Sequence, residues 1–110
     1  MKSENKIQQE CYQWFNNNYC LKNHNPRMCI FSVPNEGSNP REQMYKKSLG
    51  MRSGVSDMIV LKPNKVLFIE FKDEKGKQSD NQKVFEKTVS DLGFEYHVVR
   101  SFEEFKLAVL

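Results

Sequence analysis

Three side chains in the second half of this 110-residue sequence, Asp57, Glu70 and Lys72, are of the types that metal-assisted phosphodiester hydrolysis uses. Proteins usually hold a hard cation such as Mg²⁺ with one or two carboxylates, and water and substrate phosphate supply the remaining oxygen ligands. A lysine beside such an ion could stabilise the charge of the transition state or help to position the attacking water. This chemistry requires that all three side chains share one face of the fold.

The surrounding sequence predicts a β-hairpin that would bring them together. Residues 56–62 and 66–72 are β-rich runs separated by a Pro-Asn pair, which is a strong turn signal. A connection of two or four residues places Asp57 opposite Glu70, and the alternation of side chains sends Lys72 to the same face. Two opposed carboxylates destabilise a sheet unless something neutralises them, as a divalent cation would. The alternative is an ordinary polar sheet face exposed to water.

The rest of the chain predicts a mixed α/β (α+β) domain in the order α, β, β, β, α, β, α. Apolar spacing and capping patterns give three helices, at residues 4–21, at residues 79–92 and from Ser101 onward, and two further strands, at residues 28–33 and 95–100. Residues 34–54 are rich in Gly, Pro and Ser and predict a long loop, in which residues 43–49 could form one or two helical turns.

Composition limits the function classes. A chain of 110 residues is expected to form one domain over residues 1–110. Its longest apolar runs are four residues, against roughly 20 for a membrane span, and its start lacks a signal-peptide pattern, so a cytoplasmic protein is expected. The three Cys form no C-x-x-C pair and the two His are far apart, which argues against disulfides and zinc. Residues 41–83 carry ten Lys or Arg against six Asp or Glu, enough to contact several phosphates.

The segment Gly54-Val55-Ser56-Asp57 is followed by Ile69-Glu70-Phe71-Lys72, by Gln82 in a helix and by Val98-Val99-Arg100-Ser101. This combination, over nearly the whole chain, resembles the VRR-NUC branch of the PD-(D/E)xK nuclease superfamily, with Ser56 in place of the usual Pro. The resemblance implies a restriction-endonuclease-like fold, in which a central mixed sheet with an antiparallel hairpin is flanked by helices.

The resemblance also implies roles for individual residues. Asp57 and Glu70 would bind Mg²⁺ or Mn²⁺, and Lys72 would be the catalytic lysine. A backbone carbonyl of this strand, that of Phe71 or alternatively of Ile69, would add an oxygen ligand. Glu10 matches the acid of the family's first helix, which would approach the metal directly or through water, and Gln82 matches a helix residue near the active site. From the residues alone, Glu10 can equally be a helix-surface carboxylate and Gln82 the third residue of a capping box.

Stand-alone members of the family resemble Holliday-junction resolvases and act as homodimers in bacteria and phages. We therefore expect a homodimeric endonuclease that cleaves branched DNA in the cytoplasm of a bacterium or a phage-infected host, with no small-molecule cofactor and no membrane partner. The alternatives are a nuclease for flaps, nicks or duplex DNA, and a non-catalytic nucleic-acid binding module. The candidate DNA contacts are mostly basic and lie before and after the predicted hairpin: Asn35, Arg41, Lys46, Lys47, Arg52, Lys75 and Lys77.

Overall fold

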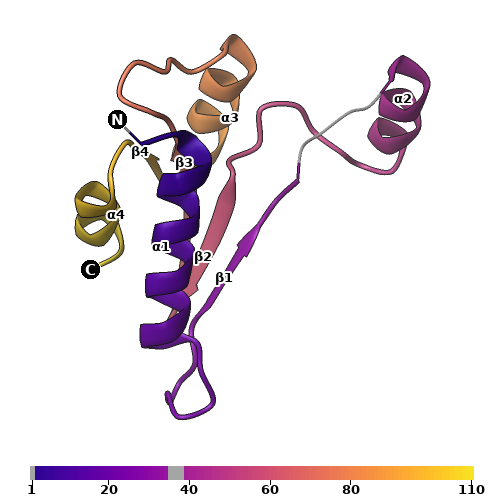
Figure 1. Cartoon of the computed structure of the whole chain (residues 1–110). Helices are drawn as coiled ribbons and strands as arrows, with labels where there is room; N and C mark the ends of the chain where they lie inside the picture. Colours follow the sequence, from indigo (N-terminus) through magenta and orange to yellow (C-terminus); the bar gives the residue numbers. More distant parts are fainter. Residues whose placement is uncertain (1, 35–38) are drawn as a thin grey trace.

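The computed structural model describes residues 2–34 and 39–110, which form an α/β domain around a single mixed sheet (Figure 1). Its elements, in chain order, are α1 (Glu4–Tyr19), β1 (Cys29–Ser32), α2 (Pro40–Ser48), β2 (Met58–Lys62), β3 (Lys65–Phe71), α3 (Asp80–Asp91), β4 (Glu95–Val99) and α4 (Phe102–Val109). The strand order is β1-β2-β3-β4; β1, β2 and β3 are antiparallel neighbours, and β4 runs parallel to β3. Within the described ranges, no helix is both long and apolar enough to span a membrane.

The hairpin of β2 and β3 has the register that the sequence predicts. Leu61 pairs with Val66, and a two-residue turn connects the strands. Asn64 in this turn has a φ of 58°, in the left-handed region that Asn tolerates better than most residues. Asp57 lies immediately before β2, and because this register continues one residue beyond the pair of Met58 and Ile69, Asp57 lies opposite Glu70, the next-to-last residue of β3.

The main core lies on the face of the sheet that α1 and α4 cover. Every second residue of β3 points into this core, and Leu67, Ile69 and Phe71 are each at most 1% exposed. Helix α1 contributes Ile7, Cys11 and Phe15 at helical spacing, and α4 contributes Phe105 and Val109.

Helix α3 covers the part of the opposite sheet face that β3 and β4 form. Phe85 of α3 makes edge-on ring contacts with Phe68 of β3, at 5.5 Å between centroids, and with Tyr96 of β4, at 6.2 Å. Since Glu70 is two residues from Phe68 on the same strand, it also faces α3 rather than the main core. The sheet therefore carries the candidate carboxylate beneath the N-terminal end of α3.

Helix α2 corrects the expectation of a loop over residues 34–54 and changes the order to α-β-α-β-β-α-β-α. The Asn39 side chain accepts a hydrogen bond from the Glu42 N–H at 2.8 Å, and Pro40 occupies the first turn, so local start signals are present. No residue of α2 is buried, and Figure 1 shows the helix standing away from the sheet. The helix lacks the apolar stripe by which sequence patterns predict helices.

The aromatic core under α4 gives a test of the fold. Phe105 is fully buried, and the centroid of its ring lies within 6.3 Å of the ring centroids of Trp14, Phe15 and Phe71. We expect Phe105→Ala to lower the free energy of unfolding by about 3–5 kcal/mol because it leaves a cavity. Leu107→Ala on the same helix, at a side chain 81% exposed, should change it by less than about 0.5 kcal/mol. Urea denaturation followed by Trp14 fluorescence measures both, and equal losses would contradict this packing.

Candidate active site

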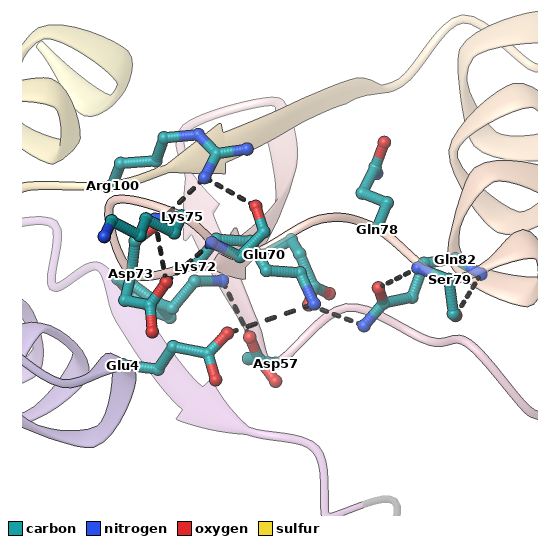
Figure 2. Close-up of polar contacts among 12 residues, drawn as sticks. Glu4, Asp57, Glu70, Lys72, Asp73, Lys75, Gln78, Ser79, Gln82 and Arg100 are labelled. Atoms are coloured by element: carbon teal, nitrogen blue, oxygen red, sulfur yellow. Dashed lines mark hydrogen bonds and ion pairs between the residues drawn. The ribbon is translucent and has the colours of Figure 1, made fainter.

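The structure brings Asp57, Glu70 and Lys72 together at one end of the sheet (Figure 2). The Lys72 ammonium lies 3.5 Å from Oε2 of Glu70. Oδ2 of Asp57 accepts a hydrogen bond from the Phe71 N–H at 2.7 Å, which ties this side chain to the strand that carries Glu70. Two carboxylates and one lysine therefore meet where β2 begins and β3 ends, as the hairpin register predicts.

Glu70 is a buried acid with an unsatisfied oxygen. The residue is 1% exposed, and its Oε2 accepts a hydrogen bond from Nε2 of Gln82 at 2.7 Å. Its other oxygen, Oε1, is buried and has no hydrogen-bond partner among the described residues. A buried carboxylate oxygen without a partner costs free energy, so such an atom in a native fold calls for an explanation.

Burial changes the pKa values of both carboxyl groups, Glu70 and Asp57. Burial, together with the neighbouring charge of Asp57, raises the pKa of Glu70 from 4.5 to about 7, whereas Lys72 opposes the shift. Burial also raises the pKa of Asp57, against the lowering effects of the Phe71 N–H and of Lys72. Without an added positive charge, the two acids therefore hold a proton at pH values where an exposed pair would be fully ionised.

These residues fit a hard divalent cation. Among the described residues there is no group of three or more His, Cys, Asp or Glu that would form a complete protein cage. Mg²⁺ does not need one, because it is commonly bound by one or two carboxylates together with substrate phosphates and water. An all-oxygen donor set with an unsatisfied Oε1 on Glu70 suits Mg²⁺ or Mn²⁺ rather than zinc.

Gln82 combines the two roles that the sequence leaves open. Its Oε1 accepts a hydrogen bond from the Ser79 N–H at 2.8 Å, and the Ser79 hydroxyl accepts one from the Gln82 N–H, which completes the capping box of α3. Its Nε2 meanwhile donates to Glu70. One amide thus caps the helix and fixes the orientation of the buried carboxylate.

Gly54 sets the distance between the Asp57 segment and α3. Its φ is +82°, and a Cβ atom at this position would lie 2.4 Å from the backbone C and O of Asn81 and 2.8 Å from the Gln82 N. Only a residue without a side chain allows this approach. The glycine that opens the Gly54–Asp57 motif therefore packs the motif directly against the first turn of α3.

Lys72 is held by a braced turn and by the start of α1. Nη1 of Arg100 donates hydrogen bonds to the carbonyl oxygens of Asp73 at 2.8 Å and Gly76 at 2.7 Å (Figure 2). This turn lies against the Lys72 side chain, because a Cβ on Gly76 would be 3.4 Å from Cδ of Lys72. On the other side, Oε1 of Glu4 lies 3.9 Å from the Lys72 ammonium, whose side chain is 12% exposed.

The structure does not bring Glu10 to the two carboxylates. Both Glu10 oxygens accept hydrogen bonds from the Lys2 ammonium at 2.9 Å, and the side chain lines a hollow of about 640 Å³ between α1 and α4. The acid of α1 that reaches the site is Glu4, which lies in the first turn. Its helix-start position after the Ser3 cap is visible in the sequence, but which turn of α1 meets the sheet end depends on tertiary packing.

The predicted DNA contacts fall into separate groups rather than one patch. Arg41, Lys46 and Lys47 lie on α2, away from the sheet, whereas Lys75 and Lys77 lie in the segment between β3 and α3 (Figure 1).

Arg52 is a further predicted DNA contact, and it lies neither on α2 nor between β3 and α3. Arg52 packs on α3, with its guanidinium 5.6 Å from the centre of the Phe85 ring and Nη2 3.4 Å from Oγ1 of Thr88. Asn35 lies outside the described residues.

Comparison with known proteins finds one family model and several solved structures. The model of the VRR-NUC domain matches residues 2–103. A solved structure described as a VRR_NUC domain protein is 18% identical, covers 99% of this chain and 86% of its own, and superimposes with a TM-score of 0.77. A second, described as a VRR_NUC domain, is 21% identical, with 98% and 96% coverage and a TM-score of 0.65. No curated protein sequence matches.

The packing of Gly54 predicts the effect of adding one methyl group. Gly54→Ala should force the Asp57 segment away from α3, and we expect a loss of more than about 2 kcal/mol in the free energy of unfolding. Gly50→Ala is the matched control, because Gly50 also has positive φ, at +104°, but has nothing within 4 Å of its Cβ position. Denaturant unfolding of both variants measures the difference, and equal destabilisation would mean that backbone conformation alone requires Gly54.

The raised pKa of Glu70 predicts a pH-dependent stability in EDTA. Because the folded chain holds this proton more tightly than the unfolded chain, the stability present below pH 4.5 is lost as pH rises towards and through about 7. The full shift corresponds to about 3 kcal/mol. Glu70→Gln cannot ionise and should be the more stable protein at pH 8, with a flatter profile between pH 4.5 and 8. Parallel profiles for the two proteins in urea titrations would contradict the assignment.

Proposed function

The chain belongs to the VRR-NUC domain family, which implies a nuclease of the PD-(D/E)xK superfamily, and we propose that it is a metal-dependent endonuclease that hydrolyses DNA phosphodiester bonds. The observation that carries this proposal is the Oε1 of Glu70, which is buried and has no hydrogen-bond partner among the described residues, on a side chain beside Asp57 whose Oε2 lies 3.5 Å from the Lys72 ammonium. Mg²⁺ or Mn²⁺ is the proposed cofactor, because both prefer oxygen donors.

The proposed roles follow from the contacts of each side chain. Asp57 and Glu70 would hold the cation, and the carbonyl of Phe71 is the proposed further oxygen ligand. When bound, the cation would polarise the scissile phosphate and lower the pKa of a water molecule that attacks it. Gln82 keeps Glu70 in one orientation, so its proposed role is to position a ligand rather than to contact the substrate.

Lys72 is the proposed catalytic lysine. It is close to Glu70 and Glu4 and is held by the turn that Arg100 braces, so its ammonium has a defined place rather than a mobile one. A fixed positive charge at this point would stabilise the extra negative charge that the phosphate gains in the transition state. The same ammonium would orient the attacking water.

The end of the sheet also favours the approach of the sugar-phosphate backbone of DNA. Helix α1 brings Glu4 to Lys72 and α3 brings Gln82 to Glu70, so both helices direct their N-terminal ends towards the site, where the helix dipole favours anions. The proposed backbone contacts come from α2, from the segment between β3 and α3 and from their flanks: Asn35, Arg41, Lys46, Lys47, Arg52, Lys75 and Lys77.

We propose branched DNA, and a four-way junction first, as the substrate of a homodimer. A junction is resolved by paired nicks in opposed strands, and a two-fold dimer of a domain with one site supplies two related sites. Helix α2 supports this proposal, because its Met44 and Tyr45 side chains and the adjacent Leu49 are 66–73% exposed and would suit burial against a second copy.

Cleavage assays on labelled four-way junction, flap, duplex and single-stranded DNA test the proposal. In Mg²⁺ or Mn²⁺ the wild-type protein should cut DNA, and EDTA should abolish cutting. Asp57→Asn and Lys72→Ala should each lower the rate by about 100-fold or more because they remove a cation ligand and a transition-state charge. Their affinity for DNA in Ca²⁺ should stay close to wild type. Lys106→Ala, at a lysine of α4 that pairs with Glu103, should behave like the wild type.

The pattern of products separates the alternatives. Symmetric paired nicks on the junction alone support a dimeric junction nuclease. Metal-dependent cutting of flaps or plain duplex keeps the nuclease and overturns the proposed substrate. Absence of cleavage on every substrate, with DNA affinity retained, would contradict the enzyme and favour a nucleic-acid binding module.

A further inference from the structure

A cleft of about 440 Å³ opens beside Asp57, and the proposed chemistry does not account for it. It lies between the first two turns of α1, the residues that follow β1 and the residues that precede β2. Its lining consists of Asn5, Gln8, Ser32, Val33, Pro34, Val55, Asp57 and Gln82. Its wall therefore includes one proposed cation ligand and the glutamine that orients the other.

The polar lining of the cleft is almost entirely neutral. Asn5 and Gln8 offer amide groups and Ser32 offers a hydroxyl, whereas the Gln82 amide is already bonded to Ser79 and Glu70. Asp57 is the only charged residue among the described lining residues. No described Lys or Arg lines the cleft. A second phosphate group inside it would therefore face the Asp57 carboxylate and would have no basic side chain to pair with. Amides and hydroxyls are instead the groups that form hydrogen bonds with the edges of nucleobases.

The orientation of α1 separates its amide side chains into two sets. Asn5 and Gln8 are three residues apart and lie on the helix face that lines this cleft. Gln9 and Gln13 line a different hollow, near Lys6 and Trp14. The side that carries Asn5 and Gln8 begins next to Glu4, which contacts Lys72. The first two turns of α1 thus place amides beside the site.

We propose that this cleft receives one nucleobase next to the scissile phosphate, turned out of the base stack and bound by Asn5 and Gln8. A base that is stacked and paired in duplex DNA cannot enter a cleft in the protein surface, so the nucleotide beside the cut must be unpaired or easily extruded. This inference rests on the proposed nuclease function and narrows its substrate to DNA in which pairing is interrupted at the cut.

A double-mutant cycle, in which one change is made in the protein and the other in the DNA substrate, tests the proposal. Asn5→Ala/Gln8→Ala is compared with the wild type and with the matched control Gln9→Ala/Gln13→Ala, on intact DNA and on DNA with an abasic nucleotide immediately 5′ or 3′ to the mapped cut. Alanine favours helix, so both double variants should keep the circular dichroism spectrum of the wild type. For the wild type and the control, the abasic nucleotide on one side of the cut should lower kcat/KM about 10-fold, as loss of one or two hydrogen bonds would.

Asn5→Ala/Gln8→Ala should lose about 10-fold on intact DNA and almost nothing more on the abasic substrate, because the two changes remove the same contact. If the losses in kcat/KM from the protein change and the DNA change multiply, the two act independently and the proposal is overturned. A wild-type protein whose kcat/KM does not change with an abasic nucleotide on either side of the cut would also overturn it. A loss of the same size in the control variant would also overturn it.

A binding readout separates this inference from the proposed nuclease function. DNA with 2-aminopurine at the same position should brighten when the wild-type protein binds it in Ca²⁺, because the base leaves the stack, and should stay dim with Asn5→Ala/Gln8→Ala. Brightening without any cleavage in Mg²⁺ would retain the base-binding cleft and refute the nuclease. Cleavage in Mg²⁺ without brightening would retain the nuclease and refute the base-binding cleft.

Discussion

The burial of an acid with one unsatisfied oxygen is the constraint around which this domain is arranged. Glu70 lies inside the sheet, where Gln82 and Lys72 both approach Oε2 and the described residues leave Oε1 without a partner. An apolar residue at this position would give a more stable hairpin, because it would avoid the desolvation of a carboxylate next to Asp57. The site accepts a loss of stability that a divalent cation would reverse, which is typical of functional sites.

The neighbouring elements hold these groups in place from two sides. On one side, the close packing of Gly54 on α3 and the capping amide of Gln82 join the Asp57 segment, the helix and Glu70 into one unit. On the other, Arg100 at the end of β4 braces the turn that follows Lys72. Each contact comes from a different part of the chain, so the geometry of the site depends on the completed fold rather than on the hairpin alone.

The sequence predicts the parts of this arrangement that local rules control. The alternation in β2 and β3 and the short turn between them give the register, and the capping box gives the start of α3. The position of Glu4 instead of Glu10 could not be predicted, because it depends on how α1 docks on the sheet. Helix α2 has start signals but no apolar stripe, and the separation of its lysines from Lys75 and Lys77 follows from its distance from the sheet.

Calorimetric titration of the metal-free protein with Mn²⁺ tests most directly whether Glu70 and Asp57 form a cation site. In buffers of different ionisation enthalpy, the wild-type protein should bind Mn²⁺ with release of part of a proton at pH 6.5 and with almost none at pH 8.5, because Glu70 titrates at about 7. Glu70→Gln should bind far more weakly and release fewer protons at pH 6.5, because only Asp57 remains to lose one. Equal Mn²⁺ affinity in the wild type and in Glu70→Gln would contradict the cation site.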